Sequence, residues 1–448
     1  MRQASSLLQK VRQFLIIFFP IFVTQLSLTA IGFVDTVMSG KVSHYDLAGV
    51  AIGANLWMPV FTGIGGVLAG ITPILAQFHG GGRKKDMPFV VVQCIYIAVA
   101  LALVVILGGW LLLSPILNMM DLEQSVHDIA YRFLAALSLG ILPLFIFSVL
   151  RNFIDALGYP RITMLITLCA VPINILLNYL LILGHWGFPR LGGVGAGYAS
   201  AITYWCLALI TLGVIRYLQP FTTYEVFGRL VAVSFKMWRE ILAVGLPIGL
   251  AIFCEVSIFG VVALLMAEYG TSVIAAHQAA INFVGLVYML PLSIGMSLTI
   301  VVGFEVGAKR YRDARQYSRL GLGIAVAISI LFAVGLFLFK NEIAGLYTQE
   351  PVVFELIKGF LVYAVFFQLS DAIAAPIQGT LRGYKDVRAT FLAAILSYWV
   401  IGMPVGYLLA QLTAFKAYGY WIGFIAGLAV GATVLFIRLV RLQEKTEK

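Results

Sequence analysis

The sequence is poor in charged residues, and this shortage excludes an ordinary soluble domain. Charged residues make up 11% of the 448 residues, whereas hydrophobic residues make up 61%. Soluble domains carry roughly a quarter charged residues. Charge-poor stretches of about 20 residues, long enough to cross a bilayer core of ~30 Å, recur along the whole chain. We therefore expect an integral membrane protein in contact with the lipid bilayer.

The hydrophobic runs also lack the alternation of polar and apolar residues that strands of a membrane barrel show. Backbone groups inside lipid must be hydrogen-bonded within the protein, which leaves the α-helix. We predict an all-α integral membrane fold with twelve transmembrane helices, the first being an uncleaved anchor. The predicted spans are residues 14–38, 47–77, 88–113, 125–150, 161–184, 192–216, 241–266, 273–304, 318–339, 355–379, 389–411 and 418–438.

Several chemical motifs are missing. The sequence has only four cysteines, all within apolar spans and without paired spacing, so we expect neither a disulfide nor a metal site made from them. It contains no H-E-x-x-H, no G-x-S-x-G and no P-loop, and the basic stretch "HGGGRKKD" at residues 79–86 lacks the P-loop ending. We therefore predict no enzyme and no cofactor, and any active transport would draw on an ion gradient.

The basic residues follow a topological pattern. With the N-terminus assigned to the cytoplasm, all but six of the 30 lysines and arginines fall on the cytoplasmic side. The six exceptions are Lys41, Arg132, Arg190, Lys340, Lys358 and Lys416. This is the distribution that the positive-inside rule predicts, with both termini cytoplasmic. The net charge of +10 thus reflects topology, and we expect no nucleic-acid partner.

The sequence repeats itself. A shift of 227 residues aligns loop charges and prolines without gaps. The matched pairs include Pro20 with Pro247, Asn55 with Asn282, Arg83 with Arg310, Asp86 with Asp313, and Arg161 with Arg388. We predict two six-helix lobes, residues 1–220 and 241–448, joined by a cytoplasmic linker at 221–240. Because six is even, the repeats are parallel, with a substrate route through a central cavity between the lobes.

Pro20 and Pro247 lie at equivalent positions inside the first and seventh spans. A proline removes one hydrogen bond from a helix and usually kinks it. The sequence leaves open whether these are static kinks or moving hinges, and we take both residues as hinge candidates.

Three acidic residues lie inside predicted spans. They are Asp35 in "GFVDTVMSG", Glu255 in "IFCEVSIFG" and Asp371 in "FFQLSDAIAAP". A charge at the bilayer centre costs ~2.5–3.5 kcal/mol, so such residues face a protein interior and typically mark ion or proton paths. The alternative is a protonated core carboxyl or, for Asp35, partial solvation near the outer interface.

Neutral polar residues accompany these acids inside the spans. We take as candidates for a substrate cavity Asn174, Asn178, His277, Gln278, Asn282 and Gln368. Amides in membrane helices also serve as hydrogen-bonding links between helices, and His277 can equally be a satisfied core histidine. Tyr288 shares a helix face with His277, and packing is its alternative role. Since no lysine or arginine lies mid-span, the interior is expected to favour cations.

Four stretches together resemble a known family. "GFVDTVMSG", "LPIGLAIFCE", "AAHQAAINFVGLVYMLP" and "QGTLRGYKDVRATF" are similar to the NorM branch of the multidrug and toxic compound extrusion (MATE) family, over essentially the whole chain. The resemblance implies a secondary antiporter of the bacterial cytoplasmic membrane. Such a protein exports cationic amphipathic drugs in exchange for Na⁺ or H⁺ while its two lobes open alternately.

The resemblance also implies residue roles. Glu255 and Asp371 would form a cation site in the second lobe, where their carboxylates would hold Na⁺, with Tyr288 nearby. Asp35 would take part in proton coupling in the first lobe. Some archaeal-type members carry a second carboxylate where this chain has Asn178. Asp35 would therefore act with amides around it.

Other functions remain as alternatives. A lipid-linked precursor flippase shares this architecture, but its pyrophosphate substrates would call for Arg or Lys in the cavity. An intramembrane enzyme would need a nucleophile with a base or a metal cluster. A passive channel suits two lobes with separate acids less well than alternating access does. We expect a monomer, and the coupling ion is left open between Na⁺ and H⁺.

Overall fold

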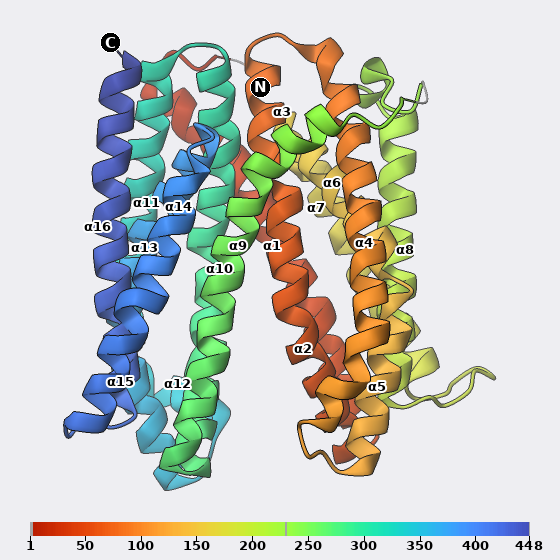
Figure 1. Ribbon diagram of the computed structural model, residues 1–448, viewed down its shortest axis with the longest axis vertical. Helices are drawn as coiled ribbons and strands as arrows, with labels where there is room; N and C mark the ends of the chain where they lie inside the picture. The colour runs from red at the N-terminus through yellow and green to blue at the C-terminus, as the bar shows by residue number, and fades with distance from the viewer. Residues whose placement is uncertain (1–2, 229–230, 448) are drawn as a thin grey trace. The chain divides into compact units, whose positions relative to one another are not determined.

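The computed structural model describes residues 3–228 and 231–447, and within them every regular element is a helix (Figure 1). Eleven helices in this part are long and apolar enough to cross a membrane. A twelfth span forms if the helices Gln124–Ser138 and Ile141–Ala156, bent by 51°, count as one. The predicted all-α membrane fold is confirmed, and the predicted span 125–150 is this bent pair. Of the basic residues counted above, Arg2, Arg229 and Lys448 lie outside the described residues.

The helices form two compact units. One unit is Phe19–Gly249, and the other joins the chain up to Phe18 with the chain from Leu250 onward. Their elements are α1 (Leu7–Gly40), α2 (His44–Ala69), α3 (Ile71–Gly80), η1 (Lys84–Asp86), α4 (Met87–Asn118), α5 (Gln124–Ser138), α6 (Ile141–Ala156), α7 (Pro160–Leu181), α8 (Gly193–Tyr217), η2 (Phe221–Tyr224), α9 (Phe235–Leu265), η3 (Met266–Tyr269), α10 (Thr271–Gly307), α11 (Tyr311–Leu338), α12 (Lys340–Tyr347), α13 (Pro351–Gly383), α14 (Val387–Ala394), the π-helix η4 (Ile395–Gly402), α15 (Met403–Leu412) and α16 (Tyr418–Glu447).

The division between the units falls inside two continuous helices. It cuts α1 just before Pro20 and α9 just after Pro247, the two prolines that the sequence repeat aligns. The start of α1 therefore groups with the second half of the chain, and the start of α9 with the first half. Each proline weakens its helix by one hydrogen bond at the place where the packing partners change. The lobe boundaries expected from the repeat, 1–220 and 241–448, stay a prediction.

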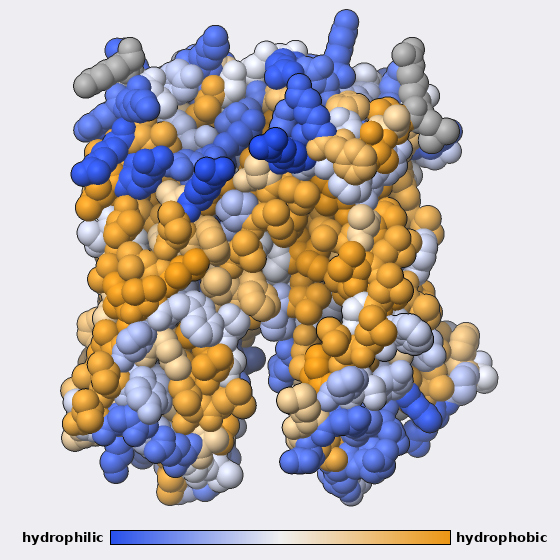
Figure 2. All heavy atoms as spheres, viewed as in Figure 1, coloured by the Kyte–Doolittle hydropathy of each residue, from blue (hydrophilic) through white to orange (hydrophobic). Residues whose placement is uncertain are grey.

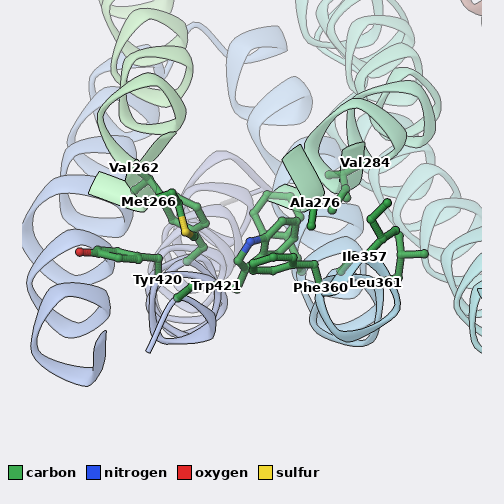
Figure 3. Packing of buried hydrophobic residues seen from close by; sticks show 14 of the residues in the cluster. Val262, Met266, Ala276, Val284, Ile357, Phe360, Leu361, Tyr420 and Trp421 are labelled. Atoms are coloured by element: carbon green, nitrogen blue, oxygen red, sulfur yellow. The ribbon is translucent and has the colours of Figure 1, made fainter. Parts of the chain in front are cut away.

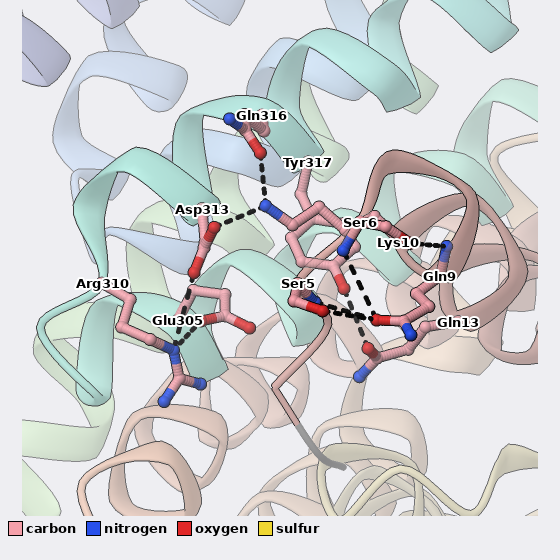
Figure 4. A network of polar contacts seen from close by, with 10 residues as sticks. All are labelled: Ser5, Ser6, Gln9, Lys10, Gln13, Glu305, Arg310, Asp313, Gln316 and Tyr317. Atoms are coloured by element: carbon pink, nitrogen blue, oxygen red, sulfur yellow. Dashed lines mark hydrogen bonds and ion pairs between the residues drawn. The ribbon is translucent and has the colours of Figure 1, made fainter.

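A charged network holds the start of α1 (Figure 4). Lys10 Nζ lies 2.5 Å from Asp313 Oδ1 and also donates to Gln316, while Tyr317 donates to Gln13 Oε1 at 2.9 Å. Lys10 is only 3% exposed, so its ammonium depends on these partners in place of water. We call this set the charged clamp.

A neutral network holds the start of α9 in the other unit. The Gln93 side chain on α4 donates to Ala232 O at 2.7 Å and accepts from the Ser234 amide at 2.9 Å and from the Trp238 indole at 3.1 Å. We call this set the neutral clamp. Because α4 and α11 are equivalent in the repeat, the two clamps occupy corresponding places with different chemistry.

Each unit has the surface of a membrane protein. On the visible face, hydrophobic residues cover the middle of each unit and hydrophilic residues gather at its ends (Figure 2). Large apolar side chains are exposed along the outer parts of α4 and α11, among them Leu107, Trp110, Leu331 and Phe337. Exposure of this kind destabilises a protein in water but is suited to lipid.

Candidate functional site

Asp35 lies at the centre of a buried polar cluster in the first unit. Its Oδ1 accepts from Asn178 Nδ2 at 2.7 Å and from Asn174 Nδ2 at 3.3 Å, and its Oδ2 accepts from the Ser200 hydroxyl. Asp35 is 5% exposed and the other three residues are at most 1% exposed. The carboxylate is thus enclosed by protein and is not solvated at an interface.

The donors around Asp35 favour its ionised form. Each hydrogen bond that the carboxylate accepts from the described residues comes from an N–H or O–H group, and a carboxylate accepts on both oxygens when it carries a negative charge. Asn178 Oδ1 is buried without a partner among the described residues. This free acceptor beside an anion is the arrangement that a bound cation would complete.

Helix geometry explains why these side chains meet. Asn174 and Asn178 are one turn apart on α7, so they share a face, and Asn178 also donates to Asn174 Oδ1 at 3.1 Å. Ser200 and Thr203 line the facing side of α8, where Asn174 Nδ2 reaches Thr203 Oγ1 at 3.5 Å. The sequence analysis missed Ser200. Its spacing of three from Thr203 was the available signal, but small hydroxyl residues are common in apolar helices.

The second cluster brings together Glu255 on α9, Asp371 on α13 and Tyr288 on α10. The hydroxyls of Tyr288 and Tyr398 hydrogen-bond to the Glu255 carboxylate, and the charges of Glu255 and Asp371 act on each other. Asp371 is 4% exposed, whereas Glu255 is partly accessible. Three residues that the sequence analysis selected separately therefore lie in one site within one unit.

One expectation about this site is wrong. The sequence analysis expected an interior without fixed positive charge, but Arg382 acts electrostatically on Glu255. Arg382 was assigned to a loop because it lies in the last turn of α13. Eleven residues make about three turns, so Arg382 lies on the same helix face as Asp371.

Two of the selected residues have partners inside the core of the second unit. Gln368 Nε2 donates to the carbonyl oxygen of Val284 at 3.0 Å, which links α13 to α10. His277 is fully buried, and its Nδ1 accepts from the indole of Trp421 at 3.1 Å. Trp421 and Phe360 belong to the hydrophobic cluster shown in Figure 3. Both contacts match the alternative roles of a helix link and a core histidine.

Gln278 and Asn282 lie instead on a cavity of about 430 Å³ in the second unit. Tyr347 also lines it and donates to Asn282 Oδ1 at 3.0 Å. The only acidic residue in its lining is Glu350, which follows α12 in a loop. Sequence reasoning missed Glu350 because a loop carboxylate is ordinary in any membrane protein. The cavity combines amides, a phenol ring, a carboxylate and apolar side chains.

Neither cluster contains the ligands of a transition metal. Within residues 3–228 and 231–447, no group of three or more His, Cys, Asp or Glu side chains could hold a metal ion. The clusters offer one or two carboxylates with neutral oxygens, a set that suits hard monovalent cations or protons.

The chain matches the family model described as MatE twice, over residues 20–180 and 247–408. The matches begin 227 residues apart, which confirms the sequence repeat. A "Probable multidrug resistance protein NorM" of Bacillus licheniformis is 55% identical over 99% of this chain and 98% of its own. The protein of the same name in Bacillus subtilis (strain 168) is 53% identical over the same shares.

Solved structures show the same fold. One described as the "outward-facing conformation of a multidrug resistance MATE family transporter of the MOP superfamily" has a TM-score of 0.88 at 18% identity, covering 100% of both chains. The two family matches and the identity to the curated relatives decide the family. The chain therefore belongs to the MatE family, in the NorM branch of the multidrug and toxic compound extrusion proteins.

Proposed function

We propose that this protein is a secondary active multidrug efflux antiporter. It is a transporter and not an enzyme, and it exports cationic amphipathic compounds in exchange for Na⁺ or H⁺ across the bacterial cytoplasmic membrane. The observation that carries the proposal is the presence of one buried carboxylate cluster in each unit, around Asp35 and around Glu255 with Asp371. The curated relatives with more than half of their residues identical are named as multidrug resistance proteins.

In this proposal the second cluster binds the coupling ion. Glu255 and Asp371 are two interacting acids in a largely buried place, and like charges there repel strongly. A sodium ion or a proton removes that repulsion. Tyr288 adds a hydroxyl oxygen that ligates Na⁺, or a hydrogen bond that orients the protonated carboxyl. Arg382 supplies partial compensation while the site is empty.

The first cluster links ion binding to helix movement in a different way. The donors around Asp35 are already matched to an anion, so an arriving ion must replace hydrogen bonds that exist. Na⁺ would use Asp35 and the free Asn178 Oδ1, whereas a proton would break at least one donor contact. Either event loosens the links between α1, α7 and α8.

We assign the drug to the cavity of the second unit that is lined by Gln278, Asn282, Tyr347 and Glu350. The Glu350 carboxylate supplies countercharge, and the Tyr347 ring offers a cation–π surface. Few charged groups and much apolar lining suit amphipathic compounds of varied shape. Pyrophosphate groups would meet an acid in this cavity, so the alternative of a lipid-linked precursor flippase is not favoured.

Alternating access uses the two proline-containing helices α1 and α9. Since the packing partners of α1 and α9 change next to Pro20 and Pro247, we assign the hinges to these residues. Ion binding outside would release the drug, and ion loss inside would let the next drug bind. The start of α1 and the end of α16 lie at the same end of the second unit (Figure 1), in keeping with two cytoplasmic termini. The protein acts as a monomer in this scheme.

The test is gradient-driven efflux of ethidium from reconstituted vesicles. We expect export from wild type under an imposed Na⁺ or H⁺ gradient and none without a gradient. Glu255→Gln should remove the response, whereas Asp128→Asn, which changes an exposed acid on α5, should leave it intact. Absence of ethidium export by wild type under both gradients would overturn the proposal.

A further inference from the structure

The predicted span 389–411 contains the single π-helix in the described part of the chain. It runs over Ile395–Gly402. The hydrogen bonds there span five residues in place of four, as the Met403 amide shows by donating to the carbonyl oxygen of Tyr398. π-Helices are rare, usually one turn long, and often mark functional sites. This one lies beside Glu255, so we consider what causes the π-helix and how it affects the contacts of Glu255.

The cause lies in Pro404, near the start of α15. A proline has no N–H to donate, and its ring collides with the carbonyl four residues earlier, here that of Val400. A widened turn moves that carbonyl aside and lets the preceding amides bond five residues back. The backbone on α16 makes room: a Cβ on Gly427 would lie 1.9 Å from Ser397 O. Glycine at 427 is therefore required by the contact.

The consequence is that two adjacent side chains reach the same helix. Tyr398 hydrogen-bonds to the Glu255 carboxylate, and the Trp399 indole donates to the carbonyl oxygen of Cys254 at 3.1 Å. In an α-helix successive side chains diverge by about 100°, as the period of 3.6 residues requires. A wider turn holds more residues, so neighbouring side chains diverge less.

The two contacts fix different parts of α9. Trp399 binds the backbone carbonyl directly before Glu255, while Tyr398 binds the carboxylate itself. Tyr398 is 3% exposed and packs edge-on against Phe259, one turn further along α9, with ring centroids 6.3 Å apart. Its hydroxyl therefore has little freedom to leave Glu255 without a movement of the helix.

We propose that Tyr398 and Trp399, aligned by the π-turn that Pro404 imposes, are positioning residues that hold Glu255 in the orientation that binds the coupling ion. This inference rests on the coupling role proposed for Glu255. It adds that the affinity for the ion depends on a distortion in a helix that contributes no acid. Relaxation of the π-turn would separate the two contacts, so ion binding and the shape of this span are linked.

The decisive variant is Tyr398→Phe, which keeps the ring and removes only the hydroxyl. Because the carboxylate loses the contact that orients it, we expect the half-saturating Na⁺ concentration for ethidium efflux to rise about tenfold, which corresponds to about 1.4 kcal/mol. The maximal rate should stay within about twofold. Tyr407→Phe, at an exposed tyrosine three residues beyond Pro404, is the matched control and should change neither value.

Two further variants test the backbone part. Trp399→Phe and Pro404→Ala should also raise the half-saturating concentration while export continues at saturating ion. Trp205→Phe is the control, because Trp205 donates to the carbonyl of Leu139 at 3.0 Å in the other unit. Titration of tryptophan fluorescence with Na⁺, at two pH values, gives a readout without transport. The ion-dependent change should disappear in Trp399→Phe and persist in Trp205→Phe.

The outcomes separate this inference from the proposed function. If Glu255→Gln loses coupling but Tyr398→Phe keeps the wild-type half-saturating concentration, the positioning role is refuted and the proposed function stands. If Glu255→Gln itself couples normally, the proposed function of the site fails first. A fall in maximal rate alone in Tyr398→Phe would also overturn the inference, since it would indicate a role in movement and not in ion affinity.

Discussion

The two polar clusters stabilise their buried carboxylates to different extents and with different groups. Around Asp35, the amides of Asn174 and Asn178 and the hydroxyl of Ser200 donate to a single carboxylate. Around Glu255, a second acid adds repulsion, and tyrosines and an arginine supply only part of the compensation. In the first cluster, donors meet both carboxylate oxygens and one amide acceptor is left over, whereas the second cluster is left short of positive charge. Equivalent scaffolds thus carry different chemistry.

The two clamps show the same contrast at the helix starts. The charged clamp uses Lys10 and Asp313, whereas the neutral clamp uses the amide of Gln93 and backbone groups. A charged contact responds to ionic strength and to loss of either partner, while a neutral one does not respond to salt. The repeat therefore preserves the docking of a helix start but not the residues that accomplish it.

The largest effect is expected from Asp371→Asn, which removes the repulsion that distinguishes the second cluster. Without that charge the coupling ion loses a ligand, and we expect ion affinity to fall at least about 100-fold. Ethidium efflux should lose its dependence on the gradient. Asp128→Asn serves as the exposed control. Unchanged coupling in Asp371→Asn would show that the second cluster is structural.

Asn178→Asp should make the first cluster resemble the second. Two carboxylates would then lie on facing helices without an added cation, and one of them should retain a proton at neutral pH because like charges repel. Since deprotonation restores the repulsion, the melting temperature of the variant should fall as pH rises, more steeply than that of wild type. A parallel pH profile for the two proteins would contradict this prediction.

Asn178→Leu removes a donor without adding charge. The Asp35 carboxylate loses its 2.7 Å hydrogen bond while it stays buried, so the free energy of unfolding should fall by about 1–3 kcal/mol. Thermal denaturation in detergent measures the loss. Asn341→Leu, at an exposed position on α12, should change stability by less than about 0.5 kcal/mol. Equal effects of both variants would mean that Asp35 does not depend on its donors.

The smallest effect is expected at the charged clamp. Lys10→Met leaves Asp313 without its nearest cation, although Asp313 is 21% exposed and can be partly hydrated. We expect a loss of about 1–2 kcal/mol in stability, measured by thermal denaturation at low salt. Lys358→Met breaks the exposed pair with Glu355 and should cost less than about 1 kcal/mol. A larger loss for Lys358→Met would reverse the ranking.

Much of the architecture could be predicted from the sequence. Apolar runs longer than a bilayer core require helices, so the spans follow from composition alone. The repeat, the in-span prolines and the family could also be read from residues, because each depends on order along the chain. Asp35, Glu255 and Asp371 were identifiable for the same reason, since a charge inside an apolar run is visible without knowledge of its neighbours.

The tertiary structure alone decided which groups surround those charges. The rotation of α8 brought Ser200 to Asp35, and the π-turn brought Tyr398 to Glu255. Packing also brought the charge of Arg382 near Glu255 and set Glu350 on the cavity. None of this follows from local spacing. It also decided that the starts of α1 and α9 group with the opposite half of the sequence. The physical reason is that the entry of a helix into the bilayer depends only on the composition of that helix. A buried contact, by contrast, depends on the relative rotation and shift of two helices, which packing across the whole unit sets.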